Sequence, residues 1–370
     1  MKTRCLSWLL VLLLLLSSCQ SHNGGDADLT STTQTESSTW EPTYEAVTLT
    51  SFDKLLIHGR MLPPTEEGLH IDWTYSGFTV QGWFDGDLVA NVFSEGELGF
   101  IFRVEVDGGE SIPQRIALGE QRVVLATLEK GYHTVTVRKV TEGSTSRVIL
   151  RSLSFRGMLD EPPKAPELKI EIIGASTSCG VGSYPEAVTN WDYLTHCDSY
   201  YAYTTMVARE LGAELNFVSV SGWGLVFGSG STEKNIPSIY SLTSYVSDRE
   251  TKWDFSSWQA DVVIITLGGN DRSAPAMLKQ SYVVYAQNFL KTVREAYPNA
   301  YILWHYGDEN EELVPHIKAA VSQMSDDRIA YLGRPRNSGG GWSHADYQTH
   351  MTYAQDVLAH LTPILTSVAD

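Results

Sequence analysis

Basic residues are scarce in this 370-residue sequence, which has 27 lysines and arginines against 44 aspartates and glutamates. The formal net charge is −17 at pH 7 with histidine neutral. A nucleic-acid partner requires a positive field that attracts the phosphate backbone, and no cluster of lysine or arginine stands out in the sequence. The composition therefore argues against nucleic acid as a partner.

Cysteines are also few, with four in the whole chain. Cys5 and Cys19 lie in or at the end of an N-terminal apolar segment, so Cys179 and Cys197 remain for the folded part. The spacing of this pair does not suit a zinc site, and we expect neither a metal nor an organic cofactor. Export would permit a disulfide between the two, and a pair of unlinked buried thiols is an equal alternative.

Long hydrophobic runs are absent apart from residues 8–16, which are too few for the ~20 apolar residues of a membrane-spanning helix. Two basic residues precede this run and small residues follow it, which is the pattern of a signal peptide. The sequence Leu-Ser-Ser-Cys at positions 16–19 resembles a bacterial lipobox, whose cysteine becomes the acylated N-terminus. We therefore predict a lipoprotein signal peptide at residues 1–19, lipidation of Cys19, and export to the bacterial outer membrane or cell surface, with ordinary secretion as the alternative.

Changes in composition divide the rest of the chain. Residues 20–41 are rich in Ser, Thr, Asp and Gly with almost no apolar side chains, which indicates a flexible tether. Residues 42–158 contain short alternating strands separated by turn residues, and this pattern indicates a β-sandwich of jelly-roll type. Residues 100–106 are an example, because they alternate and are followed by Asp-Gly-Gly, a hairpin signal. Three prolines in residues 159–166 predict a short stiff linker.

Residues 167–370 show a different pattern, in which continuous apolar runs alternate with segments of helical length. Such strands with helical crossovers form a parallel sheet that is covered on both faces. The predicted fold class is α/β, with the β-sandwich followed by a doubly wound parallel sheet. The expected strands are residues 168–173, 215–220, 262–267 and 301–304. Ligands bind beyond the carboxyl ends of such strands, so the residues that follow them are candidates for the site.

Small and polar residues follow the first three of these strands. Ser176 lies in a Gly-Ala-Ser-Thr-Ser turn, where its hydroxyl would be exposed and a helix N-terminus would favour negative charge. Gly222 follows the second strand, where its backbone N–H could approach a substrate oxygen closely. Asn270 follows the third strand, where its amide could donate to the same oxygen. Each of these segments alone is also an ordinary turn or helix cap.

A histidine stands ahead of the last predicted helix. Apolar residues recur at helical spacing from Met351 to Leu361 and form the buried stripe of that helix. His344 lies in the turn that precedes the stripe, and a general base could project from this position.

Taken together, the four segments resemble the SGNH hydrolase superfamily, whose Ser, Gly, Asn and His blocks occur in this order on a doubly wound sheet. With the β-sandwich in front, the mature chain resembles carbohydrate esterase family 2, whose members remove acetyl groups from plant-wall or related polysaccharides. The resemblance implies that Ser176 attacks the ester carbonyl, with His344 as its base, and forms an acetyl-enzyme intermediate. It also implies an oxyanion hole made by the backbone N–H groups of Ser176 and Gly222 and by the Asn270 side chain.

Two positions depart from the superfamily pattern. Ala175 stands before the nucleophile where aspartate is usual, and Gly341 stands where many members have the acidic residue that orients the histidine. We therefore expect a Ser–His dyad in which the backbone carbonyl of Gly341 or Trp342 holds the imidazole. Asp346 is the acidic alternative, and a residue of the first helical turn is the simpler interpretation of it.

Tryptophans are the candidates for contact with sugar rings. Trp223, Trp304 and Trp342 lie in or beside the predicted rim of the site, although tryptophan is also a frequent core residue. The expected activity is removal of O-acetyl groups from an acetylated polysaccharide or oligosaccharide, of the acetylxylan or acetylmannan type. The alternatives are a lipid or aryl esterase of the same superfamily and a catalytically impaired lipoprotein that binds polysaccharide.

Overall fold

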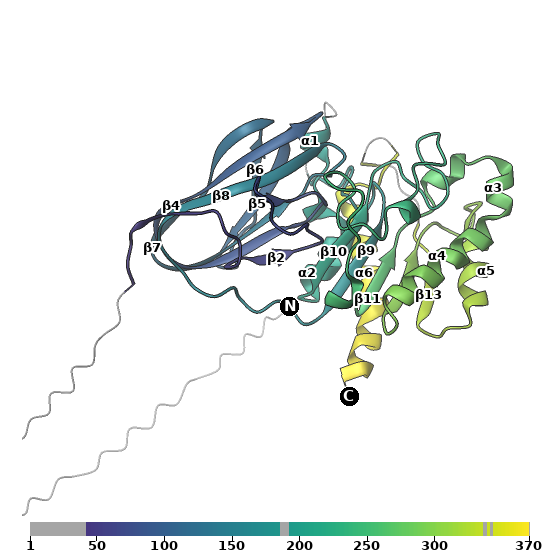
Figure 1. Cartoon of the computed structure of the whole chain (residues 1–370). Coiled ribbons are helices and arrows are strands. Elements are labelled where there is room, and N and C mark those ends of the chain that lie inside the picture. The colour runs from purple at the N-terminus through teal and green to yellow at the C-terminus, as the bar shows by residue number, and fades with distance from the viewer. Residues whose placement is uncertain (1–41, 186–191, 336–338, 341–342, 370) are drawn as a thin grey trace, which may run out of the picture. The chain divides into compact units, whose positions relative to one another are not determined.

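The computed structural model describes residues 42–185, 192–335, 339–340 and 343–369. The chain from Pro42 onward forms one compact unit, in which an antiparallel β-region precedes a parallel sheet with helices (Figure 1). No helix in this described part has both the length and the apolar character required to cross a membrane. Cys19, the predicted signal peptide, the predicted tether and Trp342 lie outside the described residues.

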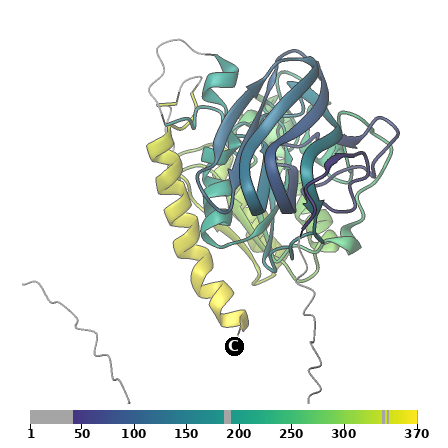
Figure 2. The same cartoon turned by 90° about the vertical axis from the view of Figure 1, so that its left-hand side faces the viewer.

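The β-region is an antiparallel sheet of eight strands, in the order β1-β8-β4-β7-β5-β6, with β2 paired to β4 and β3 paired to β8. The strands are β1 (Ala46–Leu49), β2 (Leu56–His58), β3 (Leu69–His70), β4 (Gly77–Gly96), β5 (Phe100–Val106), β6 (Ile112–Ile116), β7 (Gly119–Lys139) and β8 (Ser146–Leu159). Strand β7 has 21 residues, so this part of the β-region is longer and more continuous than the short strands expected from the sequence. The register between β4 and β7 shifts between Phe84 and Gly86 and between Leu88 and Val89, and such breaks let a long strand bend. Figure 2 shows the long, curved strands of the β-region facing the viewer.

The β-region has its own hydrophobic core, because alternate residues of its strands face inward. In β5, Phe102 and Val104 are buried and Val106 packs against the same core, as the alternation predicts. The predicted hairpin is present, since β5 pairs with β6. Asp107 and Gly108 begin its turn with φ angles of 53° and 70°, which explains the Asp-Gly sequence.

The second sheet has five parallel strands in the order β10-β9-β11-β12-β13. These are β9 (Lys169–Gly174), β10 (Glu214–Ser219), β11 (Val262–Ile265), β12 (Tyr301–His305) and β13 (Ile329–Leu332). The first four match the predicted strands. The edge strand β13 was not predicted, because three of its four residues are only half-buried and the apolar run is short.

Helices cover both faces of this sheet. They are α1 (Tyr193–His196), α2 (Tyr203–Glu210), α3 (Ala276–Gln280), α4 (Tyr282–Ala296), α5 (Val314–Met324) and α6 (Tyr347–Ala369). Ile173 and Ile265 belong to an apolar cluster with α4 and α5. Their neighbours Ile172 and Ile264 belong to a different cluster with α2 and α6. Successive strand residues thus face opposite layers, which is why these strands are apolar throughout.

Buried polar contacts connect the β-region to the parallel sheet. Arg60 Nη2 lies 2.6 Å from Glu171 Oε2, and neither side chain is exposed to solvent. Arg103 pairs in the same way with Asp198, with 2.7 Å between Nη2 and Oδ2. A third contact joins His58 in β2 to Glu214 in β10. Charged groups are stable in a protein interior only when they are paired. Each region therefore supplies the partners of buried polar side chains in the other region.

Candidate active site

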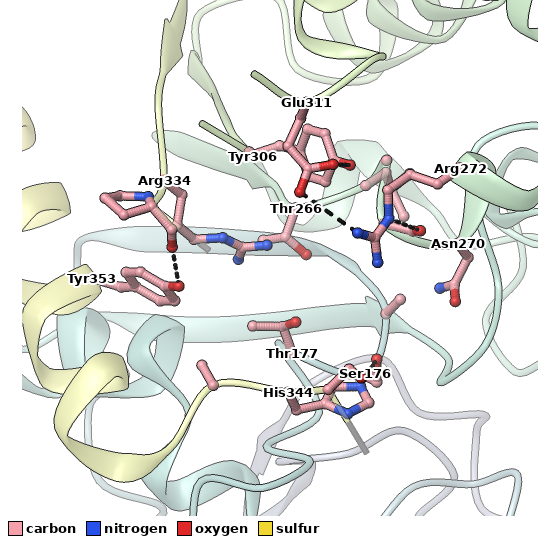
Figure 3. Close-up of a pocket in the computed structure, with 18 of the residues that line it drawn as sticks. Ser176, Thr177, Thr266, Asn270, Arg272, Tyr306, Glu311, Arg334, His344 and Tyr353 are labelled. Atoms are coloured by element: carbon pink, nitrogen blue, oxygen red, sulfur yellow. Dashed lines mark hydrogen bonds and ion pairs between the residues drawn. The ribbon is translucent and has the colours of Figure 1, made fainter. Parts of the chain in front are cut away.

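Ser176 and His344 meet in the structure although 168 positions separate them in the sequence. Ser176 lies two residues after the end of β9, and His344 lies three residues before the start of α6. The distance between Ser176 Oγ and His344 Nε2 is 2.7 Å, which is a hydrogen bond between a potential nucleophile and a potential base (Figure 3).

The turn that carries His344 packs against the turn that follows Ser176. Gly340 N donates to the carbonyl oxygen of His344 at 2.9 Å and closes the turn. Gly182 has a φ of +79°, and a Cβ on it would lie 2.6 Å from Gly340 O. Glycine at position 182 therefore permits the close backbone approach that sets the position of His344. The carbonyls of Gly341 and Trp342, expected to orient the imidazole, lie outside the described residues.

Asp346 directly precedes α6 and caps it. Its Oδ1 accepts a hydrogen bond from the backbone N–H of Thr349 at 2.9 Å. Hydrogen bonds from Thr349 lower the pKa of Asp346 below its ordinary value. This is the helix-terminal role that the sequence indicated for the residue.

The loop after β10 carries Gly222, whose φ of 80° favours glycine. The residue before it is held by Glu142, a buried residue between β7 and β8 that is 1% exposed. Ser221 N donates to Glu142 Oε2 at 2.7 Å, and the Ser221 hydroxyl donates to Oε1. The Tyr193 hydroxyl also donates to Glu142 Oε1. A carboxylate of the β-region thus fixes the loop on which the predicted oxyanion donor lies.

A second buried carboxylate holds the other end of this loop. Asp271 accepts hydrogen bonds from the backbone N–H groups of Leu225, Val226 and Phe227, at 2.9, 2.8 and 3.1 Å. Burial raises the pKa of Asp271 above its ordinary value, against the effect of these donors. The Asn-Asp doublet was the sequence signal for this residue, but it did not distinguish a loop anchor from a turn.

The Asn270 side chain lines the same cavity as Ser176 and His344. Its Nδ2 donates to the carbonyl oxygen of Trp223 at 2.8 Å, which ties the third predicted block to the second. An amide nitrogen carries two hydrogens, so one hydrogen is available to a substrate oxygen while this contact persists.

The three candidate tryptophans have different positions. Trp304 is fully buried in β12, and its Nε1 donates to Leu267 O at 3.0 Å. The prediction that Trp304 stacks on sugar is wrong, because helices cover both faces of the strand that contains it. Trp223 is partly buried and lines the cavity. Trp342 lies outside the described residues.

The cavity has a volume of about 220 Å³ and a lining that is rich in polar groups (Figure 3). The polar lining residues that were not predicted include Arg272, Tyr306, Glu311, Arg334 and Tyr353. Tyr306 directly follows a predicted strand, so the rule that ligands bind beyond the carboxyl ends of parallel strands could have found it. Arg334 follows β13, which was not predicted. In the described part of the chain, no group of His, Cys, Asp or Glu is arranged to hold a metal ion.

Cys179 and Cys197 are free and buried. Of the two alternatives that the sequence left open, the structure has the unlinked thiols. Burial raises the pKa of Cys179 well above its ordinary value, so this thiol is protonated and unreactive.

A serine hydroxyl bonded to an imidazole, with an asparagine amide in the same cavity at the carboxyl edge of a parallel sheet, is an arrangement that can carry out nucleophilic catalysis and stabilise an oxyanion. No protein-family model matches the chain. Among solved structures, the chain resembles a family two carbohydrate esterase from Clostridium thermocellum in complex with cellohexaose. The TM-score is 0.77 and the identity 27%, covering 84% of this chain and 99% of that chain.

Curated proteins give the same result. The chain is 29% identical over 276 residues to the cellulase/esterase CelE of Acetivibrio thermocellus, which covers 70% of this chain and 34% of that protein. It is 26% identical over 250 residues to an acetylxylan esterase/glucomannan deacetylase of Cellvibrio japonicus, covering 65% of this chain and 68% of that protein. The chain thus spans about a third of the length of CelE. The two curated relatives are named as esterases, and the similar solved structure is a family 2 carbohydrate esterase.

Proposed function

We propose that this chain is a family 2 carbohydrate esterase that removes O-acetyl groups from polysaccharides or oligosaccharides. The observation that carries the proposal is the 2.7 Å contact between Ser176 Oγ and His344 Nε2 inside a polar cavity. The names of the relatives support the substrate class, since one of them is an acetylxylan esterase/glucomannan deacetylase.

The reaction follows from these groups. His344 accepts the Ser176 proton while the serine oxygen attacks the acetyl carbonyl, and the imidazolium then protonates the departing sugar oxygen. Water, deprotonated by His344, attacks the acetyl-enzyme, and acetate leaves as Ser176 regains its proton. The backbone N–H groups of Ser176 and Gly222 and the Asn270 amide stabilise the negative oxygen in both steps.

The lining of the cavity favours a short acyl group over a lipid chain. Arg272, Glu311 and Arg334 all reach this cavity, and a long acyl chain would remove water from these charged groups without replacing it. The hydroxyl groups of a sugar ring can replace that water as hydrogen-bond partners of the charged side chains. Trp223 at the cavity also offers an aromatic surface to the ring. These features support the deacetylase over the lipid esterase.

We also propose a location and an attachment for the enzyme. The signal-like segment before Cys19 supports export and lipid anchoring at the bacterial membrane, with residues 20–41 as a tether. The antiparallel strands of residues 46–159 support a jelly-roll module in front of the hydrolase region. Replacing Cys19 with alanine should move the protein from the membrane fraction to the soluble fraction.

The test of the activity is acetate release from acetylated xylan, acetylated glucomannan and para-nitrophenyl acetate. Ser176→Ala should reduce the rate at least ~10³-fold, because it removes the hydroxyl that is hydrogen-bonded to His344. Ser322→Ala, an exposed serine on α5, is the matched control and should keep wild-type activity. Equal slow hydrolysis by wild type and Ser176→Ala would support the binding-protein alternative. Cleavage of long-chain esters alone would support the lipid esterase.

A further inference from the structure

Two arginines line the cavity that contains Ser176, and only one of them has an acidic partner among the described residues. Arg272 Nη1 lies 3.6 Å from Glu311 Oε1, and Arg272 Nε donates to Gly269 O at 2.9 Å. Its charge is therefore balanced within the protein. Arg334 takes part in none of the ion pairs that the described side chains form.

Arg334 is held in place by aromatic rings instead of by a carboxylate. The centre of its guanidinium lies 5.7 Å from the Tyr203 ring centre and 5.2 Å from the Tyr353 ring centre. Its Nη1 lies 3.4 Å from the Tyr203 hydroxyl, and its backbone N–H donates to Gly307 O at 2.7 Å. Figure 3 shows the guanidinium extending into the cavity toward Thr266. The side chain is thus fixed and directed before any ligand binds.

The charge of Arg334 acts on two buried histidines nearby. Burial, followed by the positive charge of Arg334, lowers the pKa of buried His350 to about 3. The same two causes, in the same order, lower the pKa of His305 well below its ordinary value. A half-buried guanidinium that discourages nearby protonation in this way favours an anion in the cavity.

We propose that Arg334 forms a subsite for a carboxylate of the substrate, so that the preferred acetylated glycan contains a uronate at or beside the acetylated sugar. The planar guanidinium can donate two parallel hydrogen bonds to a carboxylate, which a neutral sugar hydroxyl cannot accept as a pair. The inference rests on the proposed deacetylase function. Attraction of a carboxylate is expected in this cavity in particular. The chain as a whole is acidic, with a net charge of −17, and would repel such a substrate elsewhere.

The experiment compares an O-acetylated glucuronate with the corresponding O-acetylated glucuronamide, which has the same shape without the charge. Arg334→Met should lower kcat/KM for the glucuronate about ten- to a hundredfold, as loss of a charged hydrogen-bond partner does, and change the glucuronamide much less. Arg334→Lys should retain part of the preference, because the charge remains and the paired geometry is lost. Arg249→Met, at an exposed arginine that does not line the cavity, is the matched comparison, and it should leave kcat/KM for both substrates unchanged.

A measurement on the wild-type enzyme makes the test independent of folding in the variants. Glucuronate should inhibit hydrolysis of para-nitrophenyl acetate competitively at lower concentration than glucuronamide, and added salt should reduce this difference. Equal inhibition by both compounds, or an equal loss on both substrates in Arg334→Met, would overturn the carboxylate subsite and leave the deacetylase standing. Absence of acetate release by wild type from every acetylated sugar would instead overturn the proposed function.

Discussion

Glu142 offers a test of whether the β-region takes part in catalysis. Its carboxylate accepts hydrogen bonds from Ser221 N, the Ser221 hydroxyl, the Tyr193 hydroxyl and, at 3.3 Å, the Ser144 hydroxyl. Glu142→Gln keeps the shape of the side chain but leaves one acceptor oxygen in place of two. The hydroxyl groups can turn and accept from the new amide, whereas Ser221 N can only donate.

The size of the effect follows from the kinds of hydrogen bond involved. Bonds to a charged group contribute ~1.5–3 kcal/mol and neutral bonds ~0.5–1.5 kcal/mol, so Glu142→Gln should weaken the hold on Ser221 by about 1–3 kcal/mol in total. Glu142→Ala should weaken it further, because Ser221 N is then left without its partner. Removal of one oxyanion donor costs ~10²–10³ in kcat. Displacement of Gly222, which is bonded to Ser221 in the chain, should therefore lower kcat by about tenfold in Glu142→Gln and by up to ~10² in Glu142→Ala.

The assay is the steady-state hydrolysis of para-nitrophenyl acetate, with thermal unfolding measured on the same samples. The loss should fall on kcat more than on KM, because oxyanion donors act most strongly on the transition state. Glu66→Gln, an exposed glutamate of the β-region, is the control and should match wild type in both measurements. A kcat of Glu142→Ala within about twofold of wild type, in a folded protein, would refute the idea that this carboxylate positions the oxyanion loop.

Two further predictions concern stability. Glu171→Ala should lower the free energy of unfolding by ~3–5 kcal/mol in urea titrations, because it leaves the fully buried charge of Arg60 without its partner; a change under ~1 kcal/mol would show that water or another group compensates for the lost carboxylate. The pKa of His350 is about 3 in the folded protein against about 6.5 in the unfolded chain. The unfolded state therefore binds more protons between these pH values, and the free energy of unfolding should fall as the pH is lowered through that window, by up to ~1.4 kcal/mol per pH unit from this residue. His350→Asn, whose amide oxygen can replace Nδ1 as acceptor from Tyr203 N, should show a smaller pH slope, and an unchanged slope would contradict the assignment.

The sequence was informative where one physical pattern dominates a segment. Strands β9 to β12 are buried on both faces and were predicted from their apolar runs, whereas the half-exposed edge strand β13 was not. The polar residues Glu129 and Lys130 resemble a turn, yet β7 continues through them because β4 pairs with it on both sides of that point. Backbone pairing with a neighbouring strand overrides local composition here, and a single sequence does not reveal which neighbour will be present.

The sequence likewise identified some residues of the candidate site and missed others. Ser176 and His344 became candidates because each lies at the edge of a regular element, and the resemblance to the SGNH superfamily implied that they act as partners. Glu142 was missed because its hydrogen bonds are to distant parts of the chain that no spacing rule encodes, and Arg334 was missed because it follows the unpredicted strand β13. Trp304 was placed at the rim because it ends a predicted strand, but its side chain packs into the core of the covered sheet.

The buried pairs between the two regions have a consequence for any attempt to shorten this protein. A fragment that began after the proline-rich segment at residues 159–166 would retain Glu171, Asp198 and Glu214 but lose the cationic or imidazole partner of each. Three acidic groups that are now shielded would then face solvent or repel each other across a newly exposed surface. The parallel-sheet half is therefore not a portable module, and engineered fusions or swaps must transfer both halves together.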